Sequence, residues 1–97
     1  MLVDFTADWC LTCQLNERSS LEIPAVREKL AGTRTVALKG DHTLLPPAIT
    51  EELQRFNRAG VPLVLVYPRD PARPPIVLPE ILTPRLVLDA LDRAAAN

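Results

Sequence analysis

The sequence is poor in the residues that cross-link small proteins or bind metals in them. Its 97 residues include only two cysteines and one histidine. Two cysteines are too few for a framework of disulfide bonds, and a bridge between Cys10 and Cys13 would close too small a ring to stabilise the fold appreciably. A structural zinc site would need both cysteines, His42 and a carboxylate, because the second Cys/His pair of a zinc finger is missing. These counts disfavour disulfide-rich scaffolds and zinc fingers.

The sequence also lacks an excess of charge of either sign and any long apolar run. Eleven Lys and Arg residues face twelve Asp and Glu residues, so no overall field attracts nucleic acid or an anionic membrane. The most apolar stretch, 61–67, is far shorter than the ~20 residues of a membrane span, and no signal-peptide pattern opens the chain. We therefore expect a soluble chain that binds no nucleic acid and does not insert into a membrane.

The composition that remains is that of a globular domain. Hydrophobic residues make up 47% of the chain and charged residues 24%, which suits one compact core at this length. The ten prolines are dispersed, and the segments between them keep apolar periodicity, which argues against disorder. We expect one domain over residues 1–97, without internal repeats or linkers.

Apolar periodicity and cap residues predict the order strand, helix, helix, strand, helix, strand, strand, helix. A βαβ unit followed by a ββα unit predicts an α/β sandwich with a mixed sheet. The apolar run 63–67, bounded by prolines, is typical of a central strand buried on both faces. The expected strands are 2–6, 35–39, 63–67 and 76–78. The first expected helix starts at Cys10, is capped by Asp8 and ends at Glu17 or Leu21; the next two run from Pro24 to Gly32 and from Pro47 to Gly60. The last helix starts at Pro84, is capped by Thr83 and has an apolar stripe of Val87, Ala90, Leu91 and Ala94.

The most informative motif is the Cys-x-x-Cys pair, Cys10 and Cys13, at the start of the first helix and directly after a buried strand. The unpaired N–H groups and the dipole of a helix N-terminus favour the thiolate of the first cysteine. Because the thiolate is the attacking species in thiol–disulfide exchange, Cys10 is the expected nucleophile and Cys13 the expected resolving thiol. The pattern predicts an uncovered Cys10 sulfur with the Cys13 sulfur within bonding reach.

Two carboxylates flank the pair. Asp4 interrupts a strand that is otherwise apolar, and burying a carboxylate is costly unless it is paired, hydrated or protonated. Asp4 is either a proton acceptor with a raised pKa, which helps Cys13 lose its proton, or a carboxylate that faces solvent at the strand end. Glu17 shares a helical face with Cys13 and either places a second negative charge near the sulfurs or is an ordinary solvated residue.

Other residues near these motifs also have two interpretations. Pro62 precedes the strand 63–67 and could follow a cis bond, although the local sequence alone favours trans. Trp9 is either an exposed docking side chain or a partly buried core aromatic. His42 is either a surface-loop histidine, which is favoured, or a ligand, and Lys39 is most simply a solvated residue on an edge strand.

The motifs lie at residues 3–13 with Asn16 and Glu17, at 38–43, at 60–62 with 67–68, and at 78–84. Together they resemble the thioredoxin superfamily and, more closely, the C-terminal periplasmic domain of DsbD-type thiol:disulfide interchange proteins. The resemblance covers most of the chain. Leu11 and Thr12 stand where general cytoplasmic thioredoxins have Gly-Pro, which separates the chain from them.

The resemblance implies a thioredoxin-like sandwich around a four-stranded mixed sheet, lacking the first strand and helix of the full fold, as in an excised domain. The strand 35–39 would then be an exposed edge, along which two copies could pair. No metal is implied, and no cofactor other than the redox-active disulfide of the cysteine pair. The implied site consists of Cys10, Cys13, Asp4 and Glu17 as catalytic residues, cis-Pro62 facing the cysteines, and Trp9, Leu11, Thr12, Val61 and Pro62 as partner contacts.

The resemblance also implies a reductive relay. Such a domain takes electrons from the membrane-embedded dithiol of the same protein and passes them to its N-terminal domain and to periplasmic thiol-disulfide proteins, with a link to cytochrome c biogenesis. The domain would lie on the periplasmic side of the bacterial inner membrane. Two alternatives stay open: a thioredoxin-like metal carrier that uses the cysteine pair and His42, and an interaction module whose cysteines only pack or bridge.

Overall fold

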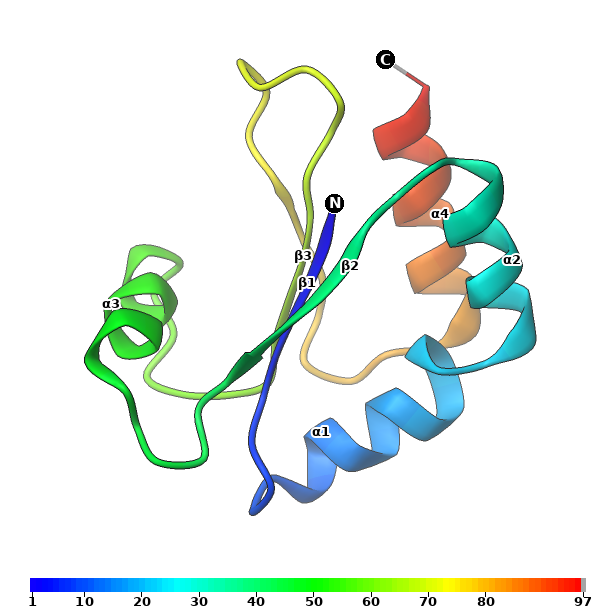
Figure 1. Cartoon of the computed structure of the whole chain (residues 1–97). Coiled ribbons are helices and arrows are strands. Elements are labelled where there is room, and N and C mark those ends of the chain that lie inside the picture. Colours follow the sequence, from blue (N-terminus) through cyan, green and yellow to red (C-terminus); the bar gives the residue numbers. More distant parts are fainter. Residues whose placement is uncertain (97) are drawn as a thin grey trace.

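The computed structural model describes residues 1–96 and places helices on both sides of a sheet (Figure 1). The strands are β1 Leu2–Thr6, β2 Ala37–Asp41, β3 Leu63–Val66 and β4 Ile76–Val77; the helices are α1 Leu11–Asn16, continued by the π-helical segment η1 Glu17–Leu21, then α2 Pro24–Gly32, α3 Pro47–Arg55 and α4 Pro84–Ala95. The predicted order of elements is confirmed. Within the part of the chain that the structure describes, no helix combines the length and apolar character needed to cross a bilayer.

The strands form one mixed sheet in the order β2-β1-β3-β4. Strand β1 is parallel to β2 and antiparallel to β3, and β3 and β4 form the predicted antiparallel hairpin. Helices α1, α2 and α4 lie on one side of the sheet and α3 on the other (Figure 1). Because β1 and β2 are parallel, the chain must cross over between them, and α1, η1 and α2 make that crossover. The Cys-x-x-Cys motif therefore lies where β1 ends and the crossover begins.

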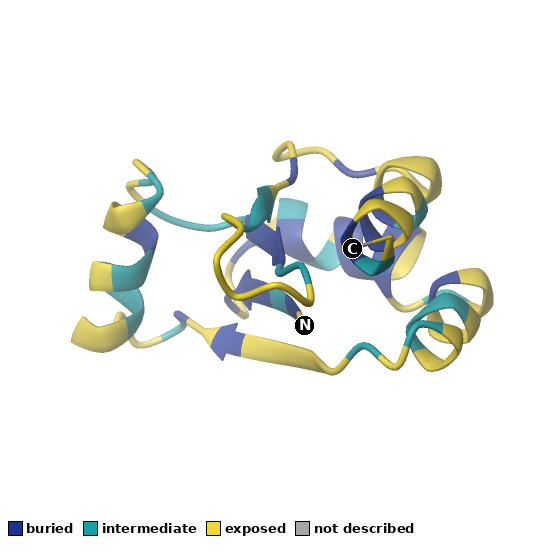
Figure 2. Cartoon of the chain, turned by 90° about the horizontal axis from the view of Figure 1, so that it is seen from above, coloured by how far each residue is buried: buried dark blue, intermediate teal, exposed yellow. Residues whose placement is uncertain are grey.

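Apolar side chains cover both faces of the sheet near its centre. All of β3 is buried, as predicted for a central strand. The edge strand β2 is exposed at every residue except Gly40, and Figure 2 shows its outer side as mostly exposed. The predicted apolar stripe of α4 is confirmed, since Val87, Ala90, Leu91 and Ala94 are all buried.

Strand β2 spans 37–41 rather than the predicted 35–39, and helix α3 ends earlier than predicted; left-handed residues explain the start of β2 and the end of α3. Strand β2 begins at Ala37 rather than at residue 35, because Arg34 has a φ of 54° and the N–H of Thr35 donates to the carbonyl of Leu30 in α2. Helix α3 ends at Arg55 rather than near residue 60, because Asn57, with a φ of 58°, turns the chain out of the helix. Asparagine tolerates the left-handed conformation better than most residues do.

Asn16 ties the helix that carries the cysteines to the segment before α4. Its side chain is buried; Nδ2 donates to the carbonyl of Glu80 at 2.8 Å, and the N–H of Leu82 donates to Oδ1 at 3.0 Å. Buried polar groups that are paired in this way cost little, and losing one partner leaves the other unsatisfied. The two bonds therefore fix α1 against the segment that leads into α4.

Candidate active site

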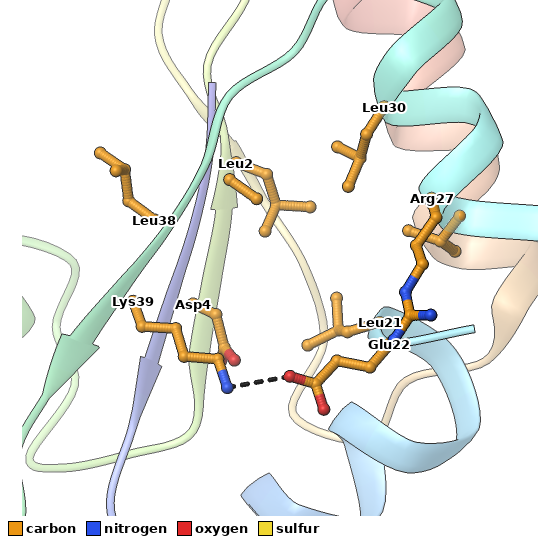
Figure 3. Close-up of a pocket in the computed structure, with 10 residues that line it drawn as sticks. Leu2, Asp4, Leu21, Glu22, Arg27, Leu30, Leu38 and Lys39 are labelled. Carbon is orange, nitrogen blue, oxygen red and sulfur yellow. Dashed lines mark hydrogen bonds and ion pairs between the residues drawn. The ribbon is translucent and has the colours of Figure 1, made fainter. Parts of the chain in front are cut away.

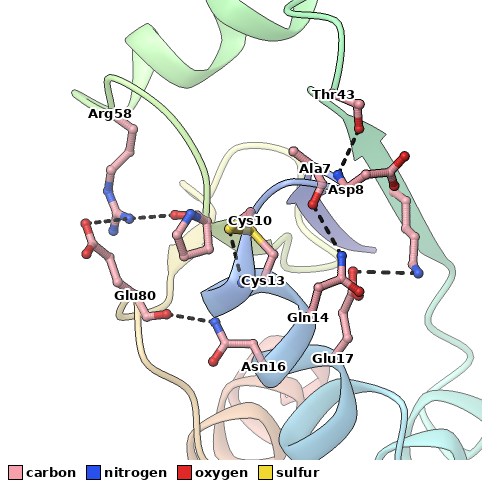
Figure 4. The surroundings of a disulfide bond; sticks show 12 residues. Ala7, Asp8, Cys10, Cys13, Gln14, Asn16, Glu17, Thr43, Arg58 and Glu80 are labelled. Carbon is pink, nitrogen blue, oxygen red and sulfur yellow. Dashed lines mark hydrogen bonds and ion pairs between the residues drawn. A yellow bond between two sulfur atoms is a disulfide. The ribbon is translucent and has the colours of Figure 1, made fainter.

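Cys10 and Cys13 form a disulfide bond at the N-terminus of α1 (Figure 4). Their Cα atoms are 5.2 Å apart. Cys10, and not the predicted Asp8, is the N-cap residue, since its Sγ accepts a hydrogen bond from the N–H of Cys13 at 3.1 Å. The helix N-terminus therefore points an N–H group at the Cys10 sulfur, which favours negative charge on that sulfur after reduction.

The two cysteines are less exposed than the sequence pattern suggested. Cys13 keeps 1% of its surface exposed and Cys10 keeps 7%, so both are buried and the prediction of an uncovered Cys10 is wrong. The reason is that Ala7 is buried in the same apolar cluster as both cysteines, and Val61 packs against that cluster. Cys10 remains the more accessible of the two cysteines.

The peptide bond between Val61 and Pro62 is cis, as the resemblance implied. Val61 packs against the cysteine cluster, which places the proline segment beside the disulfide (Figure 4). Arg58, which the sequence pattern did not single out, donates from Nη1 to the carbonyl of Pro62 at 3.0 Å and lies 3.6 Å from a carboxylate oxygen of Glu80. Arg58 therefore binds the backbone of the proline segment.

Asp4 and Glu17 are both buried, with 5% and 6% of their surface exposed, so the solvent-facing alternatives are wrong. Burial raises the pKa of Asp4 to about 7, and the hydrogen bond with Glu17 and the negative charge of Glu17 contribute in the same direction. Because this pKa is close to neutral, Asp4 can take up and release a proton near physiological pH. The chain therefore contains a buried pair of carboxyl groups, Asp4 on β1 and Glu17 on η1, one of which titrates near neutral pH.

Lys39 reaches the carboxyl pair from β2, where it is the register partner of Asp4. Its Nζ lies 2.9 Å from Oε1 of Glu22 and 3.7 Å from Oε1 of Glu17. Lys39, Asp4 and Glu22 line a cavity of about 250 Å³ between the sheet and α2 (Figure 3). The positive charge of Lys39 opposes the rise of the Asp4 pKa, and the hydrogen bond with Glu22 raises the pKa of Lys39 itself. Lys39 is a half-exposed edge residue, as predicted, and its charge also favours the ionised form of Asp4.

Neutralising Lys39 and Glu17 separately is expected to move the Asp4 titration in opposite directions. Lys39→Met removes the charge that lowers the pKa of Asp4, so the midpoint should rise above 7 by roughly half a unit to one unit, and Glu17→Gln should lower it by a similar amount. The measurement is an NMR titration of the Asp4 side-chain carboxyl carbon in the oxidised protein. Shifts of the same sign in both variants would contradict this description of the charges around Asp4.

His42 is buried, with 4% exposure, so the prediction of a surface-loop histidine is wrong. The backbone N–H of His42, which directly follows β2, donates to the carbonyl of Thr6 at 2.8 Å. The imidazole ring of His42 packs against Trp9, with the ring centroids 6.3 Å apart. Over residues 1–96, no group of His, Cys, Asp and Glu side chains is arranged to hold a metal ion. The structure thus gives no support to a metal site built from Cys10, Cys13 and His42.

Trp9 is 56% exposed, which favours a docking role over a core role. Its Nε1 donates to the carbonyl of Thr43 at 3.0 Å, and the N–H of Asp8 donates to Oγ1 of Thr43 at 2.9 Å. These bonds bring the segment after β2 beside the cysteine motif, a juxtaposition that the sequence pattern did not predict. All five residues that are expected to contact a partner keep some exposed surface: Trp9, Leu11, Thr12, Val61 and Pro62.

Comparison with known proteins gives consistent matches. Residues 1–69 match the family Thioredoxin_7, which is described as thioredoxin-like. The thiol:disulfide interchange protein DsbD 1 of Pseudomonas aeruginosa is 37% identical over 67 residues, which make up 69% of this chain and 11% of that protein. The DsbD protein of Vibrio cholerae is 34% identical over 64 residues, 66% of this chain and 10% of that protein. The chain thus spans about a tenth of the length of these relatives.

Solved structures match over nearly the whole chain. The reduced C-terminal domain of DsbD from Neisseria meningitidis superposes with a TM-score of 0.72 and 23% identity, covering 97% of this chain and 79% of that one. Chloroplastic thioredoxin z superposes with a TM-score of 0.74 and 26% identity, covering 99% of this chain and 78% of that one. The predicted thioredoxin-like fold and the resemblance stated from the sequence motifs are confirmed.

Proposed function

The chain belongs to the thioredoxin-like family, and we propose that it catalyses thiol–disulfide exchange through Cys10 and Cys13. The observation that carries the proposal is the disulfide at the start of α1, where the Cys10 sulfur accepts an N–H of the helix. A bond between residues only three apart in sequence restricts the unfolded chain very little, so stabilisation is a poor reason for it. Its position at a helix N-terminus, beside cis-Pro62 and close in the chain to a titratable carboxyl pair, suits reversible exchange.

The exchange proceeds in two displacements. In the reduced protein, the Cys10 thiolate attacks one sulfur of a partner disulfide, a bond forms between them, and the second partner sulfur leaves as a thiolate. Cys13 then loses its proton and attacks the Cys10 sulfur, which releases the first partner sulfur as a thiolate and forms the Cys10–Cys13 disulfide. Two electrons pass to the partner, and the two cysteine sulfurs supply them without another cofactor.

The proton of Cys13 goes to the Asp4 and Glu17 carboxyl pair in this proposal. The pKa of Asp4, about 7, lies within about two units of the ordinary pKa of a thiol, about 8.5, so a proton moves between them at little cost. Lys39 keeps the Asp4 carboxyl from becoming a still weaker acid, which preserves its ability to release the proton afterwards.

The relatives support a narrower role within the same chemistry. Both are named thiol:disulfide interchange proteins, and both are far longer than this chain. The proposed role is therefore that of one relay domain, reduced by a membrane-embedded dithiol of the same interchange protein and oxidised by its N-terminal domain and by periplasmic thiol-disulfide proteins. This role places the domain on the periplasmic side of the bacterial inner membrane, with a net reductive flow.

A redox titration tests the proposal. The chain is equilibrated with graded ratios of reduced and oxidised glutathione, its free thiols are trapped by alkylation, and the alkylated species are counted by mass. We expect one reversible two-electron transition at a potential more negative than about −200 mV. A pair that shows no reversible couple would favour a plain interaction module, and a strongly oxidising value, near about −120 mV, would reverse the assigned direction of electron flow.

A further inference from the structure

Two leucines near the cysteine motif are exposed to solvent. Leu44 is 91% exposed and Leu45 is 59% exposed, on the segment between β2 and α3. They follow Thr43, whose carbonyl and hydroxyl accept hydrogen bonds from Trp9 and from the backbone of Asp8. The segment 43–45, called loop 43–45 below, is therefore attached to the residues that lead directly into Cys10.

Loop 43–45 has a defined conformation. Oδ1 of Asp41 accepts hydrogen bonds from both the N–H and the hydroxyl of Thr43, and the N–H of Leu45 donates to the carbonyl of His42 at 3.0 Å. Leu45 has a φ of 52°, a left-handed conformation that is unfavourable for a leucine. The surrounding bonds thus hold the loop in a conformation that leaves both leucine side chains uncovered.

Two more apolar side chains, next to Cys10 in the sequence, are exposed. Trp9 and Leu11, on the two sides of Cys10 in the sequence, are 56% and 85% exposed. Single exposed apolar side chains are common on proteins, but a contiguous group of them marks an interaction surface. Because Trp9 is hydrogen-bonded to Thr43, which directly precedes the two leucines, a partner disulfide that approaches the Cys10 sulfur comes close to loop 43–45.

The two charged residues that are hydrogen-bonded to Thr43, Asp8 and Asp41, are both acidic. Asp8 and Asp41 are both exposed and line one pocket together with Lys39. Lys39 is already paired with Glu17 and Glu22, so it does not neutralise these two aspartates. Hydrogen bonds from Thr43 lower the pKa of Asp41, which keeps its carboxylate charged across the neutral range. A partner with a positive charge at this position is electrostatically complementary.

We propose that loop 43–45 is a specificity element that docks a partner segment in which apolar residues and a basic residue flank the reacting cysteine. This inference rests on the proposed exchange function and adds the kind of substrate that the site prefers. Leu44 and Leu45 bury apolar side chains of the segment, Asp8 and Asp41 attract its basic residue, and the Cys10 thiolate attacks its cysteine sulfur.

The test uses synthetic peptides with one cysteine activated as a mixed disulfide with 2-nitro-5-thiobenzoate. One peptide carries leucine and lysine beside the cysteine, a second carries serine and lysine, and a third carries leucine and glutamate. Ellman's reagent serves as a small disulfide without a peptide. Attack by the reduced protein on the peptide sulfur releases the coloured thiolate, whose absorbance gives the second-order rate constant, and Cys13 then displaces the peptide thiol.

The leucine–lysine peptide is expected to react about tenfold faster than either of the other two peptides. Leu44→Ser should reduce the preference for the leucine–lysine peptide over the serine–lysine peptide by at least fivefold, and it should leave the rate with Ellman's reagent unchanged. The control is Val36→Ser, at an apolar side chain that is 62% exposed and lies just before β2, and it should change neither rate. Because Leu44 is almost fully exposed, its replacement should leave the thermal unfolding midpoint of the protein unchanged.

Different results overturn different statements. Equal rates with all three peptides, in protein that reacts with Ellman's reagent, would overturn the docking role and leave the exchange function standing. A Leu44→Ser variant that slows Ellman's reagent as much as the peptides would also overturn it, since the loop would then act on the sulfurs and not on the partner. Absence of release from all four probes would overturn the exchange function and this inference with it.

Discussion

Replacing Cys10 with serine is expected to abolish exchange with any disulfide. The serine hydroxyl cannot act as the attacking group at neutral pH, and Cys13, with 1% of its surface exposed, is too buried to replace Cys10. The measurement is the rate of reduction of a protein disulfide by the reduced variant, compared with the unaltered chain. Normal turnover by Cys10→Ser would show that the assignment of the nucleophile is wrong.

Replacing Cys13 with serine is expected to leave the first displacement intact and to block the second. The variant should accumulate a mixed disulfide between Cys10 and the partner, because the intramolecular attack that releases the partner is lost. The lifetime of this species should increase by roughly 100-fold or more, since a neighbouring thiol has a very high effective concentration. Mass spectrometry of the acid-quenched mixture identifies the linked cysteine, and a partner linked through any residue other than Cys10 contradicts the scheme.

Replacing Asp4 with asparagine is expected to stabilise the fold while it slows exchange. The folded-state pKa of Asp4 is about 7, against an ordinary value of 3.8, so the folded protein binds this proton more tightly than the unfolded chain does. Stability from this group is therefore fully present below pH 3.8 and is lost as the pH rises through 7. At pH 8 the variant should be more stable by about 2 to 4 kcal/mol, and near pH 4 the difference should shrink towards zero.

Urea unfolding of the oxidised proteins at pH 8 and pH 4 measures this difference. Asp8→Asn is a matched control, because Asp8 is exposed and its replacement should change stability at neither pH. In the Asp4→Asn variant, release of the partner from the mixed disulfide should slow by roughly 100-fold, as expected when a general base is removed. Destabilisation of Asp4→Asn at pH 8 would contradict the raised pKa of Asp4. Exchange at the normal rate would remove Asp4 from the proton-transfer step.

Much of the fold is predictable from local chemistry. The apolar run before residue 67 predicts a buried central strand, and Thr83 followed by Pro84 predicts the start of α4, where Thr83 Oγ1 accepts the N–H of Leu86. The end of α3 and the start of β2 are not predictable in this way, because they depend on the left-handed conformations of Asn57 and Arg34. A glycine at these positions would have indicated such a conformation, whereas asparagine and arginine indicate it only weakly or not at all.

The site is predictable only where its residues are close in the sequence. The spacing of Cys10 and Cys13 and the apolar context of Asp4 point to the chemistry directly. The contribution of Lys39 depends on the β1–β2 register, and the contact of Thr43 with Trp9 depends on the end of β2, which are both long-range features. The burial of His42 has the same origin, because its backbone extends the pairing of β2 with Thr6.

The relative reactivity of the two thiols tests the central claim most directly. The reduced chain is treated with a limiting amount of iodoacetamide near neutral pH, and peptide mass mapping gives the rate at which each cysteine is modified. The helix N-terminus and the greater exposure of Cys10 predict that it reacts at least about tenfold faster than Cys13. Equal rates, or faster modification of Cys13, would contradict the assignment of Cys10 as the attacking sulfur.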